Sequence, residues 1–473
     1  MEKRGDHAVV LGASMGGLLV ARVLADFYDQ VTVVERDILP TDPVNRRGVP
    51  QGRLIHACLA RLTQVLDDLF PGLSEDLVAR GVTSWNDGDF SKLNWTLAGH
   101  SMVRSGRSPD APHILSPSRP VLEWIVRQRV RAIANVAFKE GHDVVGVTAT
   151  ADRRQVTGVR VVDRADDRVK TMAADLVVDA TGRGSRTPVF LEQLGYGRPP
   201  EDEVVVQLAY ACQLLRIAPG VIKEHMIANF PAPGRPRMFA MIGYEHNSWM
   251  IGAGTMAGTE PPCDHAGILA FAAELAPAHV VEAIRTAEPI GDVVHHRVPS
   301  NRWRRYDKMR RLPEGLVVVG DAVCSFNPIY GQGMTVAAIE ATVLRDCLLR
   351  GGRGLTSRFT RLAAKNVRVA WQTAVASDLA LPEVAGPRPL SMRMSNACLE
   401  PVITATESDH VVAAQFMRIT AMIDPPSRLL RPSILLRILR ARRRRQTGSQ
   451  SVTEGFGGDA DRILGSNRVA AGR

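Results

Sequence analysis

A glycine-rich turn near the start of the chain is the first feature that could bind a ligand. The run Gly12-Ala-Ser14-Met-Gly16-Gly17 follows a short apolar strand pattern and opens a helical pattern. Gly12 permits a tight turn, and Gly17 lets the helix pack close to the sheet, so N–H groups at the helix start can bind a pyrophosphate. Ser14 stands where the G-x-G-x-x-G fingerprint has its second glycine, which slightly hinders backbone approach.

An acidic residue completes this pattern. The β-branched run 31–34 predicts a second strand, and it ends at Glu35. A carboxylate at this point can accept hydrogen bonds from ribose hydroxyls. The alternative is a glycine turn that binds no ligand, as found in any α/β protein, because the motif alone is a weak signal. The combination of a strand before the turn, a helix after it and Glu35 at the expected spacing favours dinucleotide binding.

A second segment, far along the chain, indicates which dinucleotide is bound. A buried-strand pattern ends there at Gly320-Asp321, and a loop with proline and glycine follows. NAD needs no second distant segment, whereas FAD is long enough to need one. We expect Asp321 to hold ribityl hydroxyls and the loop to offer backbone N–H groups to the flavin ring. A helix beginning near Thr335 would direct its positive end at the same edge and favour a reduced, anionic flavin.

These residues resemble the G-D…P…G-Q-G segment of the class A flavoprotein monooxygenases, the para-hydroxybenzoate hydroxylase and squalene epoxidase fold. Two further stretches are similar to bacterial squalene-epoxidase-like and polyether-epoxidase-like enzymes. The run from Arg46 to Arg53, with His56, resembles their loop after the second strand. Ser118-Arg119-Pro120 resembles their helix start, where an arginine contacts the flavin side of FAD. The resemblance extends from about residue 7 to about residue 440.

The resemblance and the motifs together give a set of expected FAD-binding residues. They are Gly12, Ser14, Met15, Gly16, Gly17, Glu35, Arg36, Arg46, Arg47, Arg119, Gly320, Asp321, Pro328, Gly331, Gln332, Gly333 and Met334. Arg46 and Arg47 could instead be solvated loop charges. Arg119 begins a helix, where a cation is unfavourable unless an anion is nearby. His56 is interpreted as a structural histidine, and Trp85, Trp95 and Trp249 as core or pocket wall.

One stretch departs from the family pattern. Many class A enzymes carry D-G-x-x-S-x-x-R, which is linked to both FAD and NADPH binding. Here Thr181 replaces the aspartate of that motif, and Pro188 stands where its arginine would be. The expected electron donor is therefore NADPH or NADH, acting directly or through a partner flavin reductase.

The resemblance implies a monooxygenase mechanism. Reduced flavin would react with O2 to give a C4a-hydroperoxide, which passes one oxygen atom to an apolar organic substrate, by epoxidation of an alkene or by hydroxylation. The protein must exclude water and orient the substrate, so no general base and no catalytic side chain is named. An FAD-dependent reductase of isoprenoid double bonds is the alternative. A flavin halogenase is a third reading, although its W-x-W-x-I-P motif is not found, and a basic surface-binding protein is a non-enzyme reading.

The predicted fold class is α/β: a discontinuous, Rossmann-like FAD-binding domain, an inserted β-rich substrate domain and a helical C-terminal part. The FAD-binding domain is assigned to 1–80, 117–200 and 300–350, and the substrate domain to 81–116 and 201–299. Residues 351–445 are expected to be helical, and 446–473 to form a disordered polar tail.

Composition limits the remaining functions. The formal net charge is +10, much of it from arginines near the C-terminus, and no helix-turn-helix pattern suggests nucleic-acid binding. Six scattered cysteines without C-x-x-C spacing, and no histidines at metal-ligand spacing, predict a cytoplasmic protein without a metal site. Residues 428–445 combine leucines with arginines. This segment is expected either to pack on the body or to contact an anionic membrane peripherally.

Overall fold

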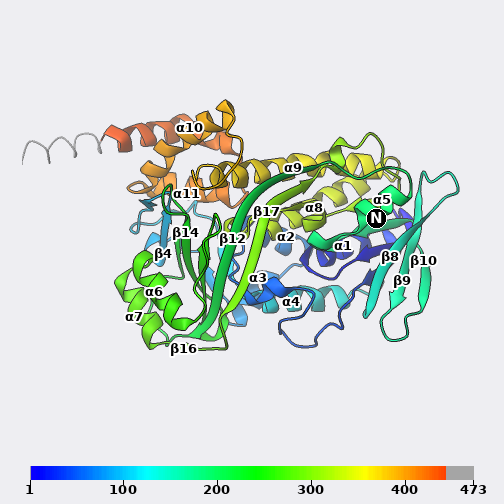
Figure 1. The fold of residues 1–473 in the computed structure, drawn as a ribbon, viewed down its shortest axis with the longest axis horizontal. Helices are drawn as coiled ribbons and strands as arrows, with labels where there is room; N and C mark the ends of the chain where they lie inside the picture. The colour runs from blue at the N-terminus through cyan, green and yellow to red at the C-terminus, as the bar shows by residue number, and fades with distance from the viewer. Residues whose placement is uncertain (1, 444–473) are drawn as a thin grey trace, which may run out of the picture.

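The computed structural model describes residues 2–443 and contains two large sheets (Figure 1). The strands of the first sheet are β1 (Gly5–Leu11), β2 (Tyr28–Val34), β7 (Val136–Lys139), β11 (Leu176–Asp179) and β18 (Leu316–Val318). They are all parallel, in the order β18-β11-β1-β2-β7. Parallel strands covered on both faces are mostly apolar, as in the β-branched run Val31–Val34. This sheet is Rossmann-like, as the sequence predicts.

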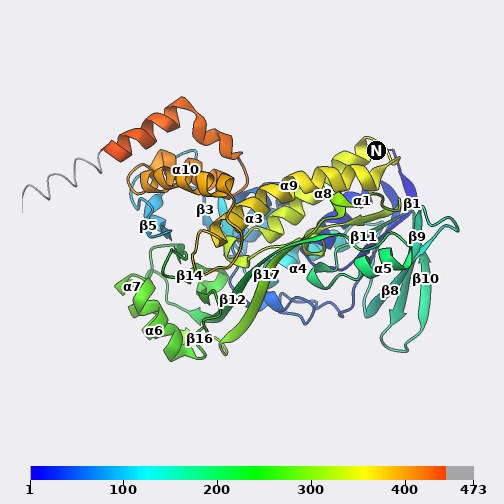
Figure 2. The same cartoon turned by 45° about the horizontal axis from the view of Figure 1, so that its top comes forward.

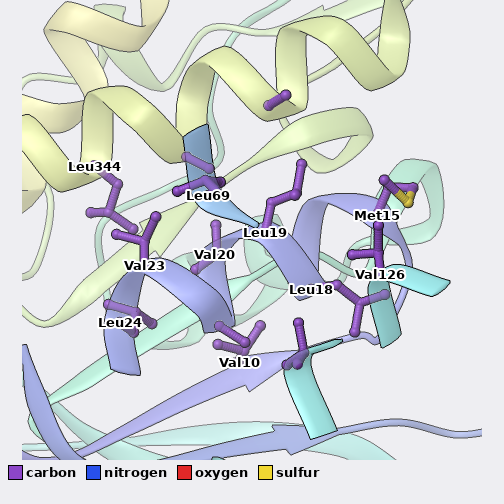
Figure 3. Packing of buried hydrophobic residues seen from close by; sticks show 14 of the residues in the cluster. Val10, Met15, Leu18, Leu19, Val20, Val23, Leu24, Leu69, Val126 and Leu344 are labelled. Atoms are coloured by element: carbon purple, nitrogen blue, oxygen red, sulfur yellow. The ribbon is translucent and has the colours of Figure 1, made fainter. Parts of the chain in front are cut away.

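Helices from distant parts of the chain cover one face of this sheet. They are α1 (Met15–Ala25), α2 (Ala60–Leu69), α3 (Leu73–Ala79), α4 (Arg119–Arg131) and α8 (Gly333–Leu349). Helix α1 is apolar almost all round because it is buried on every side, against Val10 of β1, Val126 of α4 and Leu344 of α8 (Figure 3). Each such buried side chain contributes roughly 1.5–3 kcal/mol. The core therefore fixes α1 and α8 next to each other.

A small antiparallel sheet flanks the other face. It consists of β8 (His142–Ala149), β9 (Val156–Asp163) and β10 (Val169–Ala173), and it lies at one end of the molecule in Figure 1. Val156, Val159 and Val161 of β9 pack against Val177 of β11. The short helix α5 (Thr187–Gln193) follows β11.

The second large sheet is mixed and has the order β19-β17-β12-β15-β14-β13-β4-β5, with β16 paired to β12. Its strands are β4 (Leu93–Leu97), β5 (His100–Ser101), β12 (Glu201–Arg216), β13 (Met226–Asn229), β14 (Arg237–Gly243), β15 (Ser248–Thr255), β16 (Glu288–Pro289), β17 (Val294–Arg304) and β19 (Cys324–Ser325). A separate pair joins β3 (Thr83–Trp85) to β6 (Ile114–Ser116). One face of the large sheet is covered by α6 (His265–Leu275) and α7 (Ala278–Thr286), through Phe239, Ile251 and Ile268.

The C-terminal part is helical. It contains α9 (Leu355–Asp378), α10 (Leu390–Thr406), α11 (His410–Thr420) and a helix over 432–443 (Figure 2). Ile434 and Ile438 of the last helix are buried against the body, whereas Leu435, Leu436 and Leu439 are exposed. Within residues 2–443, no helix is long and apolar enough to cross a membrane. The expected disordered tail, 446–473, lies outside the described residues.

The fold class expected from the sequence is confirmed. Residues 54–59, which precede α2, form an irregular loop. Leu54, in this loop, is nevertheless buried, which explains its apolar pattern. The expected division between residues 299 and 300 lies inside β17, which continues to Arg304 and pairs with β19 of the later segment.

Candidate cofactor-binding site

The glycine turn joins β1 to α1 in a conformation that only glycine tolerates. Gly12 has a φ of +96°, and a Cβ there would lie 2.8 Å from the carbonyl oxygen of Ala180. A Cβ on Gly17 would lie 1.8 Å from the carbonyl oxygen of Gly12. Met15 and Gly16 form the first turn of α1, where N–H groups have no intrahelical partner. The two glycines therefore let the turn pack directly on the neighbouring backbone, and the free N–H groups at the start of α1 can meet an anion.

Glu35 connects this turn to the end of β2. Its Oε2 accepts a hydrogen bond from the N–H of Ala13 at 2.8 Å, and its Oε1 accepts one from the N–H of Asp37 at 3.0 Å. The carboxylate is almost completely buried. The Glu35 carboxylate fixes the glycine turn. Its remaining lone pairs are expected to accept hydrogen bonds from ribose hydroxyls.

Arg46 is an interior ion-pair partner and not a solvated loop charge. Its guanidinium lies 2.7 Å from Glu123, 3.0 Å from Asp37 and 3.4 Å from Glu35. Burial alone would lower the pKa of Arg46, but these carboxylates outweigh it and raise the pKa. Arg46 therefore ties the loop after β2 to helix α4.

Two neighbouring arginines are exposed beside a groove. Arg36 lies 3.7 Å from Asp143 in a solvent-exposed pair, and Arg47 is exposed. Both line an open groove of about 670 Å³ that runs from the end of β2 to the start of β8, together with Arg46 and His142. The end of the second strand is the side on which dinucleotide-binding folds hold the adenosine half. The groove therefore lies where a dinucleotide-binding fold holds an adenosine half.

Arg119 joins three of the predicted segments. Its Nη2 donates to Ser14 Oγ at 2.8 Å and lies 3.0 Å from Glu123, and its Nη1 lies 2.8 Å from the sulfur of Met334. The anion that a cation at this helix start requires is present as Glu123, one turn further along α4. Arg119 is buried, so it holds the glycine turn and the second segment together.

The second segment lies against the first. Gly320 has a φ of +63° and Gly331 a φ of +66°, so the loop between them reverses direction at two glycines. Asp321 is exposed to solvent and lies near the charges of Arg119 and Arg183. A Cβ on Gly333 would lie 3.7 Å from Asp321, which places this acid over the start of α8.

Helix α8 begins at Gly333, two residues before the expected start at Thr335. A Cβ on Gly16 would lie 3.6 Å from Ala337 in its second turn. The starts of α1 and α8 therefore lie side by side, and a single elongated anionic ligand can meet both. Gln332 is buried at this helix start. Pro328, within the turn Pro328–Tyr330, completes the predicted set.

The stretch that departs from the family motif forms a closed hydrogen-bond cluster. Asp179, at the end of β11, accepts hydrogen bonds from the N–H and hydroxyl of Thr181, at 2.8 and 2.6 Å. It also accepts hydroxyl hydrogen bonds from Ser185 and Thr187, both at 2.5 Å. Thr181 thus donates to the strand-end acid, where the family motif would place a second carboxylate.

His56 is a structural residue, as the sequence predicts. Its Nδ1 lies 3.0 Å from the carbonyl of Leu54, and its backbone N–H donates to the hydroxyl of Tyr244 at 2.7 Å. Burial, reinforced by the charge of Arg119, lowers its pKa to about 4, so the ring is neutral at pH 7. Among residues 2–443, no cluster of histidine, cysteine, aspartate or glutamate could hold a metal ion.

Two buried acids near the second segment were not predicted from the sequence. Glu340 of α8 accepts the N–H of Gly320 at 2.6 Å, and Asp378 of α9 accepts hydrogen bonds from the loop before α8. Each is a single acid in an otherwise apolar helical stretch. Such a position is a recognisable signal, because an isolated carboxylate is rarely buried without a partner.

Comparison with known proteins finds relatives that cover most of the chain. A family model described as FAD binding domain matches residues 7–375. Protein Rv3254 of Mycobacterium tuberculosis is 39% identical over 435 residues, which cover 89% of this chain and 90% of that protein. Kynurenine 3-monooxygenase of Salinispora tropica is 28% identical over 412 residues, 80% of each chain.

Solved structures share the fold at low identity. PqsL of Pseudomonas aeruginosa, in complex with 2-aminobenzoylacetate, has a TM-score of 0.59 and 16% identity, covering 87% of this chain and 99% of that one. p-Nitrophenol 4-monooxygenase PnpA of Pseudomonas putida has a TM-score of 0.61 and 14% identity, covering 90% and 100%. The flavin-dependent brominase Bmp2 has a TM-score of 0.61 and 13% identity, covering 88% and 93%.

Proposed function

Because the chain belongs to the FAD binding domain family, we propose that it is an FAD-dependent monooxygenase that transfers one oxygen atom to an apolar organic substrate. The product would be an epoxide or a hydroxylated compound. Kynurenine 3-monooxygenases among its relatives, and monooxygenases that share its fold, support this reaction class. The epoxidase branch suggested by the sequence remains a prediction.

The residues present fit FAD. The tight turn that Gly12 and Gly17 permit leaves the N–H groups at the start of α1 free, which suits a pyrophosphate. Glu35 and the groove beside Arg36 and Arg47 suit the adenosine half, and Asp321 suits the ribityl chain. Bound FAD, once reduced, would activate O2 for the transfer of one oxygen atom.

The proposed substrate class rests on a row of small residues across the large sheet, and this observation carries the proposal. Ala228 of β13 is paired with Ala240 of β14, Ala240 with Gly252 of β15, and Gly252 with Cys212 of β12. Trp95 of β4 continues the row beyond Ala228. Directly paired residues point to the same face of a sheet, so the row forms a shallow floor.

The walls above this floor are apolar as well. Ile55, Phe230, Met238 and Ile329 pack with Ala228 and Ala240 in one cluster, and Ile329 belongs to the loop expected to face the flavin. A Cβ on Gly252 would lie 2.9 Å from Ile55, so the two surfaces are in contact.

These side chains would bind an apolar substrate next to the flavin and exclude water from it. The indole N–H of Trp95 is buried and has no hydrogen-bond partner among residues 2–443. It is available to orient an oxygen atom of the substrate.

Two routes could deliver electrons to the flavin. NADPH or NADH would reduce it directly, or a partner flavin reductase would supply the electrons. The cluster around Asp179 leaves no second carboxylate at position 181, so we propose that direct reduction is slow. Anaerobic mixing of the purified flavoprotein with NADPH or NADH, with and without a flavin reductase, distinguishes the two routes.

The proposal is tested by filling the floor. The Ala240→Phe substitution inserts a ring over the row while every expected FAD-binding residue stays in place. We expect flavin content to be unchanged, turnover of an apolar alkene or aromatic substrate to fall at least about tenfold, and O2 to be diverted to H2O2, since a misplaced reactant loses much of its rate. Val205→Phe, at an exposed position on β12, is the matched control.

Two outcomes would count against the proposal. Unchanged coupling of O2 to product in Ala240→Phe would mean that the substrate binds elsewhere. Product formed by the wild-type protein in the absence of O2 would favour the alternative, an FAD-dependent reductase of isoprenoid double bonds.

A further inference from the structure

The last residue of α9 forms a buried polar centre behind the flavin-facing loop. Asp378 is 0% exposed and accepts hydrogen bonds from three side chains. Asn301 Nδ2 donates to its Oδ2 at 2.6 Å, and Asn327 Nδ2 and the Tyr330 hydroxyl donate to its Oδ1 at 2.9 and 2.8 Å. All three donors point at one carboxylate.

These four residues come from three separate parts of the chain. Asn301 lies on β17, Asn327 and Tyr330 lie on the loop before α8, and Asp378 ends α9. Asn301 Oδ1 also accepts the backbone N–H of Asn327, and Asn327 Oδ1 accepts the N–H of Ile329 at 3.2 Å. The loop is therefore held at its first residue by both the sheet and the helix.

Holding the loop through a buried carboxylate has a high cost in free energy. Among the residues that the structure describes, the groups that act on the Asp378 carboxylate are these three hydrogen-bond donors, none of which is a cation. Burial raises its pKa to about 6, although the three donors oppose that shift, so the group is mainly ionised at pH 7.5. A buried charge with hydrogen bonds but no counter-ion costs more than a neutral apolar contact of the same size. A strict geometric requirement would explain why the arrangement is used.

We propose that Asp378 is a positioning residue that sets the loop 327–331 against the flavin and the substrate floor. The loop carries Pro328 and Gly331, whose backbone is expected to face the flavin, and Ile329, which packs on the apolar floor. Asp378 thereby links the C-terminal helices to both sides of the reaction site. This inference rests on the proposed function, because the loop matters only if flavin and substrate meet beside it.

An exchange of side chains between positions 301 and 378 tests the proposal. In Asp378→Asn, one amide oxygen still accepts from Asn327 and Tyr330, but the new NH2 group faces the NH2 group of Asn301. In Asn301→Asp, two carboxylates face each other. In the double variant, the amide at 378 donates to the carboxylate at 301, and that carboxylate still accepts the N–H of Asn327. The double variant thus restores every hydrogen bond of the network.

The readouts are flavin retention, KM and kcat for an apolar substrate, and the fraction of O2 released as H2O2. We expect each single variant to raise KM or H2O2 release by about tenfold, the scale of one unsatisfied buried hydrogen bond. We expect the double variant to return to within about threefold of the wild type. Asp409→Asn, which retains a capping side chain at the start of α11, is the matched control and should change nothing.

The possible failures are distinguishable. Tyr330→Phe removes a single donor and should shift coupling in the same direction, so it serves if a single exchange variant does not fold. A double variant that is no better coupled than the single variants would overturn the positioning role. A wild-type protein that retains FAD but forms no oxygenated product would instead contradict the proposed function.

Discussion

Replacing Glu340 with glutamine should make stability less dependent on pH. Glu340 is 0% exposed, its Oε2 accepts the N–H of Gly320, and its Oε1 has no partner within residues 2–443. Burial, with the nearby charge of Asp321 adding to it, raises its pKa from 4.5 to about 8. The group is therefore protonated in the folded protein at pH 7 and ionised in the unfolded chain.

The sign and size of the effect follow from this difference. A carboxyl with a raised folded pKa contributes stability that is fully present below pH 4.5 and is lost as the pH rises to about 8. At about 1.4 kcal/mol per pH unit, the whole interval corresponds to about 5 kcal/mol. Glutamine keeps the acceptor for Gly320 and does not titrate. The stability of Glu340→Gln relative to the wild type should therefore increase by several kcal/mol from pH 4.5 to 8 and then level off.

Urea unfolding at pH 5, 6, 7, 8 and 9, followed by tryptophan fluorescence at equal FAD saturation, measures this difference. Glu192→Gln, in an exposed pair with Arg198, controls for the substitution itself. A constant difference between Glu340→Gln and the wild type across this range would refute the reasoning, because it would mean that Glu340 is ionised in the folded protein.

Two further predictions concern the cofactor site and the C-terminal helix. The Arg119→Gln substitution removes the cation that joins Ser14, Glu123 and Met334, and it should weaken FAD binding about tenfold or more. Flavin fluorescence on dilution measures this binding. Arg107→Gln, on the surface, is the control and should leave FAD binding unchanged. The helix over 432–443 exposes leucines beside arginines and should float with anionic phosphatidylglycerol vesicles at low salt, but not at high salt. The double substitution of Leu436 and Leu439 by glutamine should abolish flotation; no flotation of the wild type at low salt would exclude the membrane contact.

The sequence allowed the fold class and the tight turn after the first strand to be predicted because those features depend on local constraints. Gly12 and Gly17 are required because a Cβ at either position would clash with neighbouring backbone. Glu35 is recognisable because it stands at the end of a strand. The same constraint applies to Gly320, whose backbone turns at a positive φ. Such requirements appear directly in residue type and spacing.

The features missed by sequence analysis depend on pairing across the fold. Nothing in the sequence indicates that Ala228, Ala240 and Gly252 share one row, because strand register is set by three separate strand pairings. The sequence alone allows Arg46 to be interpreted as a loop charge, because its partner Glu123 belongs to a later helix. Asp378 likewise meets Asn301 only because α9 folds back over the large sheet.

The most direct test of the central claim is the fate of molecular oxygen. The purified flavoprotein, reduced and then mixed with 18O2 and an apolar alkene or aromatic compound, should give a product that contains one labelled oxygen atom. Unlabelled product, or product formed equally well without oxygen, would contradict the assignment as a monooxygenase.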